Sequence, residues 1–113
     1  MRWFMKYTPT NPNQSAEHHA AIGAYAAEAA RAGILVDTGT IEASGTWVKQ
    51  VAGKHAHTDG PFPETKELIV GYAIINAATR DEAIAHARTF LSVAGDGEVE
   101  IRAMVGGAEW PPH

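Results

Sequence analysis

Alternating apolar and polar residues at the start of the chain predict a β-strand. In Arg2–Tyr7 one side carries Trp3, Met5 and Tyr7 while the intervening residues form the other side, which is the period of two expected of a strand. Residues 8–13 hold two prolines among turn-forming residues, so this stretch is predicted to be a loop.

A helix is predicted from residue 15 to residue 32. Ser15 can cap its N-terminus, Glu17 lies favourably in the first turn, and Gly33 can end it in a left-handed conformation. Residues at helical spacing form a stripe on one side: His18, Ile22, Tyr25 and Ala29. The many alanines are expected to let this helix lie close to the surface that it covers.

The middle of the chain is predicted to form strands and turns. A strand is predicted from Ile34 to Ile41, and a hairpin is predicted from Thr46–Val51 and Lys54–Thr58 around Ala52-Gly53. Residues 59–63, Asp-Gly-Pro-Phe-Pro, are predicted to be a loop because two prolines remove the donors that a central strand needs.

The last third of the chain is predicted to form a buried strand, a helix and a final strand. Leu68–Ile75 is apolar on both faces, which is typical of a strand at the centre of a sheet. Thr79 and Glu82 form a capping box that starts a helix, with its apolar stripe running from Ala83 to Leu91. A turn at 95–97 precedes a final alternating strand, 98–104.

This order predicts an α+β fold: a ferredoxin-like βαββαβ arrangement with an inserted β-hairpin. The 113 residues, 12.1 kDa, correspond to one domain. We assign residues 1–105 to it and treat 106–113, a Gly-Gly and Pro-Pro segment, as a C-terminal tail.

Both helices are expected to cover one face of the sheet, which leaves the other face uncovered. Because the central strand is apolar on both sides, we expect a second copy of the chain to cover that face in a homodimer. The alternation of the last strand then points polar groups into the space between the two sheets, where they form a small-molecule pocket: Glu98, Glu100 and Arg102, together with Phe4 and Lys6 of the first strand.

Composition and charge exclude several classes of function. The formal net charge of −4 gives no electrostatic footprint for nucleic acid. No apolar run approaches the ~20 residues that span a bilayer, and the absence of cysteine suits a reducing compartment. We therefore expect a cytoplasmic protein with no nucleic-acid or membrane partner. Without a GxGxxG, Walker or Gly-x-Ser-x-Gly pattern, no cofactor is expected.

Residues 58–67, TDGPFPETKE, resemble the signature of the DGPF, or YCII-related, family of small bacterial proteins. Further landmarks of that family follow in the same order over nearly all of residues 1–104: Ala32-Gly33-Ile34-Leu35, Gly71-Tyr72, Asp81-Glu82-Ala83 and the segment 95–102.

The resemblance implies a dimeric α/β barrel built from two ferredoxin-like halves. It also implies two functions: a role in transcription initiation with an extracytoplasmic-function sigma factor, and, in the YCII branch, an enzymatic role for a His and Asp pair. Asp59 supplies the carboxylate of that pair here, whereas the helix histidine of the branch falls at Ile22, with His18 one turn earlier.

Asp59 is the first candidate for catalysis. If the pocket raised its pKa, it would act as a general base with His57 or His18 as partner; alternatively, it accepts hydrogen bonds in its own turn. Lys66 and Glu67 are candidates for binding an anionic ligand, against the commoner case of an exposed ion pair.

Three more side chains are candidates for ligand binding. Arg102 suits a carboxylate, although a salt bridge with Glu100 that seals the dimer is the plainer interpretation. Tyr25 and Tyr72 can donate hydrogen bonds into the pocket or simply pack. The six histidines do not have metal-ligand spacing, so no metal site is expected.

Two functions follow from these observations. The first is a cytoplasmic homodimer that binds an unidentified small molecule, with acid/base catalysis by Asp59 and His57 as an open extension. The alternative is a regulatory partner protein without catalysis, linked to a sigma factor.

Overall fold

The computed structural model of the chain describes residues 1–11, 15–42, 45–59 and 69–106. Its elements follow one another as β1 (Arg2–Pro9), α1 (Ala16–Arg31), β2 (Leu35–Glu42), β3 (Thr46–Val51), β4 (Lys54–Asp59), β5 (Ile69–Asn76), α2 (Arg80–Ala94) and β6 (Gly97–Met104). The predicted order of strands and helices is confirmed, with boundaries that differ by a residue or two.

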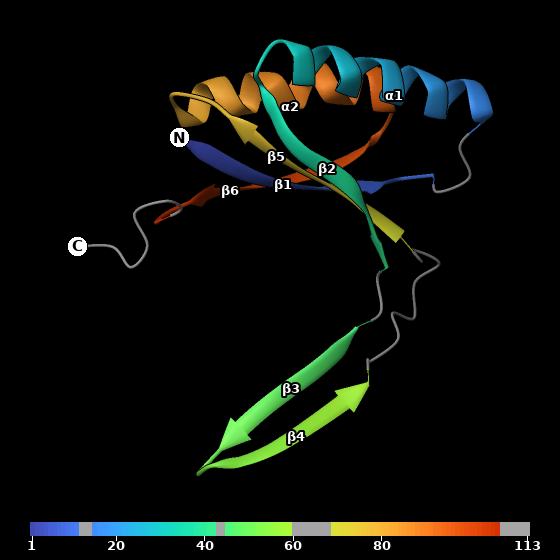
Figure 1. Ribbon diagram of the computed structural model, residues 1–113. Coiled ribbons are helices and arrows are strands. Elements are labelled where there is room, and N and C mark those ends of the chain that lie inside the picture. Colours follow the sequence, from blue (N-terminus) through green and yellow to red (C-terminus); the bar gives the residue numbers. More distant parts are fainter. Residues whose placement is uncertain (12–14, 43–44, 60–68, 107–113) are drawn as a thin grey trace.

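Four strands form one antiparallel sheet in the order β2-β5-β1-β6. Both helices lie over the same face of this sheet (Figure 1), so the predicted α+β, ferredoxin-like fold is confirmed. The strand predicted to be central, β5, is an inner strand of the sheet. β3 and β4 form the inserted hairpin as a separate two-stranded sheet.

The helices begin where their capping residues predict. The hydroxyl of Ser15 accepts a hydrogen bond from the backbone N–H of His18 at 3.1 Å, and that of Thr79 accepts one from Glu82 at 3.2 Å. The carboxylate of Glu82 reaches back to the N–H of Ala78 at 3.0 Å, one residue before the cap. The backbone N–H and the carboxylate of Glu82 together therefore hold the first turn of α2.

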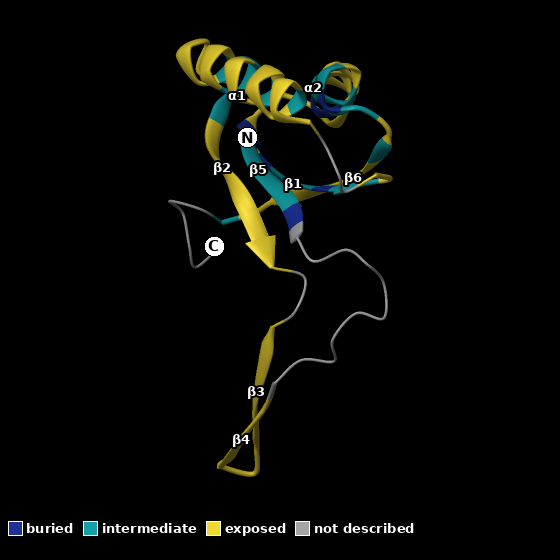
Figure 2. Ribbon diagram, turned by 90° about the vertical axis from the view of Figure 1, so that its right-hand side faces the viewer, coloured by how far each residue is buried: buried dark blue, intermediate teal, exposed yellow. Residues whose placement is uncertain are grey.

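The core lies between β1, β5 and α2. Trp3 and Met5 project from β1 toward the helices and are buried together with Ile75 of β5 and Ala83 and Ala87 of α2. By contrast, α1 contributes no buried residue to the core, and most of its surface is exposed (Figure 2). The expectation that its alanines would let it lie close to the sheet is therefore wrong.

The hairpin projects away from the four-stranded sheet (Figures 1 and 2). Its two-residue turn has both residues in the left-handed region, with φ of 52° at Ala52 and 78° at Gly53, which is the geometry of the hairpin turns that match strand twist. β4 continues to Asp59, paired with Thr46, so it ends one residue later than predicted.

The face of the sheet without helices carries an aromatic pair. The rings of Phe4 and Tyr72 stack with centroids 6.4 Å apart and an interplanar angle of 12°. The Tyr72 ring extends over Gly39 of the neighbouring strand, where an added Cβ would lie 2.9 Å from the ring. The hydroxyl of Tyr72 donates a hydrogen bond to Asp37 Oδ2 at 3.1 Å. Because a side chain at position 39 would collide with the ring, Gly39 is needed for this hydrogen bond.

This hydrogen bond raises the pKa of Tyr72 above the ordinary 10.0, with smaller contributions from burial and from the charge of Asp37. Since the raised pKa belongs to the folded state, the pair stabilises the fold below pH 10 and this contribution is lost as pH rises through the raised pKa.

We predict that Asp37→Asn lowers the pKa of Tyr72 toward 10.0, because the carboxylate that favours the neutral phenol is removed. The ζ-carbon chemical shift of each tyrosine, followed against pH by NMR, measures this. The pKa of Tyr25, which burial raises, is the internal control and stays unchanged. A pKa of Tyr72 that is the same in both proteins would contradict the assignment.

Candidate functional site

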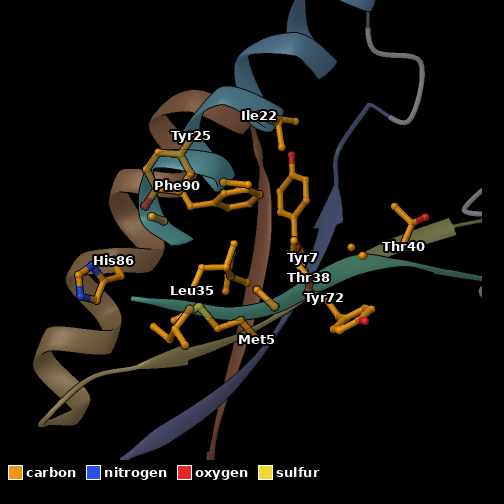
Figure 3. Close-up of a pocket in the computed structure, with 18 of the residues that line it drawn as sticks. Met5, Tyr7, Ile22, Tyr25, Leu35, Thr38, Thr40, Tyr72, His86 and Phe90 are labelled. Atoms are coloured by element: carbon orange, nitrogen blue, oxygen red, sulfur yellow. Dashed lines mark hydrogen bonds between the residues drawn. The ribbon is translucent and has the colours of Figure 1, made fainter. Parts of the chain in front are cut away.

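A cavity of about 710 Å³ lies between α1 and the helix-covered face of the sheet. Figure 3 shows its walls: Met5 and Tyr7 from β1, Leu35 and Thr38 from β2, Ile22 and Tyr25 from α1, and His86 and Phe90 from α2. This volume is in the range of pockets that hold small organic molecules. The cavity is therefore the candidate functional site of the described part of the chain.

The space exists because α1 is held at its two ends and carries small residues between them. The residues of α1 that line the cavity include Gly23, Ala26 and Ala29, whose side chains are too short to fill it. α1 lies mainly against α2 and β2, and none of its residues is fully buried. The helix therefore does not fill the space above the centre of the sheet.

The N-terminal part of α1 is tied to the end of α2. Nε2 of His18 donates a hydrogen bond to the carbonyl oxygen of Ala94. The hydroxyl of Tyr7 lies 3.3 to 3.4 Å from the carbonyl oxygens that follow one another there: those of Ala94, Gly95 and Asp96. Because these carbonyls carry the negative end of the helix dipole, donors are favoured at this point.

The C-terminal end of α1 is tied to β5. Gly33 ends the helix with φ of 77°, as predicted, and its carbonyl oxygen accepts a hydrogen bond from the side-chain amide of Asn76 at 3.1 Å. The backbone N–H of Asn76 donates a hydrogen bond to the carbonyl oxygen of Ile34 at 2.8 Å. These bonds hold the exit of α1 against the sheet.

Three aromatic rings form one wall of the cavity. Phe90 of α2 contacts Tyr7 edge to face, with centroids 5.1 Å apart, and contacts Tyr25 at 6.1 Å. Ile34, Leu35, Ile75 and Val99 add aliphatic surface. The interior is therefore suited to an apolar molecule, and aromatic rings favour contact with another ring.

The polar side chains of the wall are phenols, hydroxyls and imidazoles. The described lining has no Lys, Arg, Asp or Glu; its polar side chains are those of Tyr7, His19, Tyr25, Thr38, Thr40, Tyr72 and His86. Burial raises the pKa of Tyr25 above 10.0, so its phenol is a neutral donor at physiological pH. An anionic ligand would find no fixed cation here.

The structure places the predicted site residues in three different regions. Tyr25 lines one end of the cavity, whereas Tyr72, whose ring stands on the helix-free face, borders the opposite end (Figure 3). His18 is not among the residues that line the cavity, and it is hydrogen-bonded to Ala94 as above. Arg102 is outside it, on the helix-free face, where its Nε donates to Glu100 Oε1 at 2.6 Å. Arg102 and Glu100 form an ion pair within the chain, whereas the expectation that this pair seals a dimer stays a prediction.

The two predicted catalytic residues lie on the hairpin. His57 is exposed on β4, opposite Val48, and Asp59 is the last residue of the same strand. His57 does not line the cavity formed by the described residues. Lys66 and Glu67 lie outside the described residues. The roles assigned to these four side chains stay predictions.

Sequence analysis missed two histidines of the cavity wall, His19 and His86. His86 lies within the apolar stripe of its helix, because Ala83, His86, Ala87 and Phe90 follow the spacing i, i+3, i+4, i+7 of one helical face. A polar residue inside an apolar stripe was therefore the signal for it.

Residues 1–11, 15–42, 45–59 and 69–106 contain no group of three or more His, Cys, Asp or Glu side chains that could hold a metal ion. Over the same ranges, neither helix has the length and apolar character needed to cross a membrane.

Comparison with known proteins assigns the chain to a family. The chain is 36% identical over 58 residues to an uncharacterised protein of Rhizobium meliloti (strain 1021). The match covers 50% of this chain and 47% of that protein, so the aligned part spans about half of its length. The model of the YCII-related domain matches residues 1–107. The chain thus belongs to the YCII-related domain family.

Proposed function

We propose that this protein binds a small, neutral and largely apolar organic molecule in the cavity between α1 and the sheet. The observation that carries the proposal is the 710 Å³ cavity with an apolar wall and without a charged side chain in its described lining. An apolar ligand would be stabilised there by roughly 25 cal/mol for each Å² of its surface removed from water.

This site differs from the pocket expected between two sheets. The polar groups expected there, Lys6, Glu100 and Arg102, satisfy one another in an ion-pair network on the helix-free face. The cavity lies on the other face of the same sheet. Catalysis by Asp59 and His57 is a separate extension of the proposal, and it needs the hairpin to meet a ligand.

We predict that N-phenyl-1-naphthylamine, a neutral probe that fluoresces in apolar surroundings, binds the protein and that Ala26→Trp weakens this binding at least tenfold. The indole would occupy the space that the inner face of α1 leaves free. Fluorescence titration measures the dissociation constant, and circular dichroism checks the fold of the variant.

Ala27→Trp is the matched control, because Ala27 is exposed on the same helix and does not line the cavity. It should bind the probe as the wild type does. Equal binding by wild type and Ala26→Trp, or no binding by the wild type, would contradict the proposed function.

We further propose that two copies pair through their helix-free faces. Phe4, Tyr72 and Ile74 share this face by strand register and are only half-buried in one chain. The flanking network of Lys6, Glu100 and Arg102 carries both signs of charge, which suits contact of a face with itself across a two-fold axis. A second sheet would complete the two-sided burial of β5.

We predict that the wild type sediments as a dimer of about twice 12.1 kDa, whereas Ile74→Glu sediments as a single chain because it buries a charge in the seam. Ala27→Glu, on the exposed side of α1, should remain dimeric. Phe4→Glu repeats the test at a second position. A wild type that is folded and monomeric throughout the micromolar range would contradict the pairing.

The projecting hairpin favours a second function, contact with a partner protein. Trp47, Val48 and Val51 are 60%, 71% and 72% exposed, and the described hairpin has no extensive contact with the sheet or helices. The radius of gyration, 16.5 Å, exceeds the roughly 13 Å of a compact chain of this length. Since an isolated hairpin is marginally stable, it is suited to bind a protein, for which a sigma factor is the candidate.

A further inference from the structure

Two polar groups in the cavity wall have no hydrogen-bond partner among the described residues. One is the hydroxyl of Tyr25 on α1, and the other is the imidazole of His86 on α2. Nε2 of that imidazole is buried and out of a ligand's reach, which leaves Nδ1 as the nitrogen that a ligand can contact. Both side chains lie at the same end of the cavity in Figure 3, whereas Thr40 and Tyr72 lie at the other end. Polar groups left unpaired in such a wall are the ones that a ligand can satisfy.

Phe90 brings the two groups together. It lies one turn after His86 on α2, so the two side chains lie on the same face of that helix. Its ring also contacts the ring of Tyr25, with centroids 6.1 Å apart. A phenol from one helix and an imidazole from the other therefore flank one aromatic ring at this end of the apolar wall.

The neighbouring carboxylate determines how His86 can act. Oε1 of Glu82 lies 3.8 Å from Nε2 of His86, while Oε2 of the same carboxylate is held by the N–H of Ala78. A fixed carboxylate beside Nε2 favours the tautomer that has its proton on this nitrogen. Nδ1 then keeps the lone pair and is the acceptor left for a ligand.

We propose that the Tyr25 hydroxyl and the His86 imidazole bind the oxygen of a neutral ring compound with a single hydroxyl group, such as a phenol or a naphthol. His86 accepts the proton of the ligand's hydroxyl, and Tyr25 donates to its oxygen. The rings of Phe90, Tyr7 and Tyr25 contact the ligand ring. This inference rests on the proposed function and specifies its ligand class.

The uncharged wall supports this class over others. A carboxylate or phosphate would lose its hydration without gaining a lysine or arginine partner, because the described lining has neither. A hydrocarbon without oxygen would leave Tyr25 and His86 unsatisfied, which costs binding free energy. One hydroxyl on an apolar ring satisfies both conditions.

The experiment compares 1-naphthol with naphthalene, two probes that differ by one hydroxyl group. Each is titrated against protein that contains N-phenyl-1-naphthylamine, and displacement of the fluorescent probe gives the dissociation constant. The wild type should bind 1-naphthol about tenfold more tightly than naphthalene, the difference expected from one satisfied pair of hydrogen bonds.

Tyr25→Phe and His86→Leu should each reduce this preference to twofold or less while naphthalene binds within about twofold of wild type. His55→Leu, which removes an exposed histidine on the hairpin, is the control and should keep the preference. Equal binding of both probes by the wild type, or an unchanged preference in both cavity variants, would overturn the inference.

The failure of the proposed function gives a different result. In that case N-phenyl-1-naphthylamine does not bind at all, whereas failure of this inference alone leaves its binding intact. The ¹⁵N chemical shifts of the His86 ring test the tautomer independently. A proton on Nε2 supports the assignment of Nδ1 as acceptor, and a proton on Nδ1 in the free protein overturns it.

Discussion

The way in which α1 is attached determines what this fold can do. Hydrogen bonds hold the helix at both ends: His18 to the carbonyl of Ala94 near its start, and Asn76 to the carbonyl of Gly33 at its end. Between these ties the helix has no buried residue. Polar contacts at its two ends, together with packing against α2 and β2, thus hold it over the sheet, and the volume beneath it stays open as the cavity.

The two helices have different roles because their contacts differ. α2 buries Ala83, Ala87 and Ala94 and forms the core with β1 and β5. It therefore gives the sheet a rigid cover from which His86 and Phe90 reach the cavity. The opposite face of the sheet presents Phe4 and Tyr72 beside a network of charges, which gives one small domain two separate surfaces for binding.

Local patterns predicted the fold well because each has a local cause. The caps at Ser15 and Thr79 form the expected hydrogen bonds, and alternation in β1 assigned Trp3 and Met5 correctly to the core. The family also followed from short motifs, and the match over residues 1–107 confirms it. These features depend on residues near one another in the sequence.

The site could not be predicted in the same way, because it depends on contacts between distant residues. The alanines of α1 would allow close packing on the sheet. The position of the helix also depends on the hydrogen bond from His18 to Ala94, which joins residues 76 positions apart and is not visible in a local pattern. The pocket was accordingly expected on the helix-free face, and His86 was overlooked although it lies within an apolar stripe. Tyr25 and Tyr72 border the cavity, and their roles in ligand binding stay predictions.

Methyl NOE spectroscopy of the ligand-free protein tests this account most directly. The methyl group of Ala87 lies in the core with Met5 and Ile75 and should show strong cross-peaks to them. The methyl groups of Ala26 and Ala29, which face the cavity, should show none to Met5 or Ala73 across it. Strong cross-peaks from these two alanines to the sheet would mean that α1 packs directly on it, and no cavity would exist.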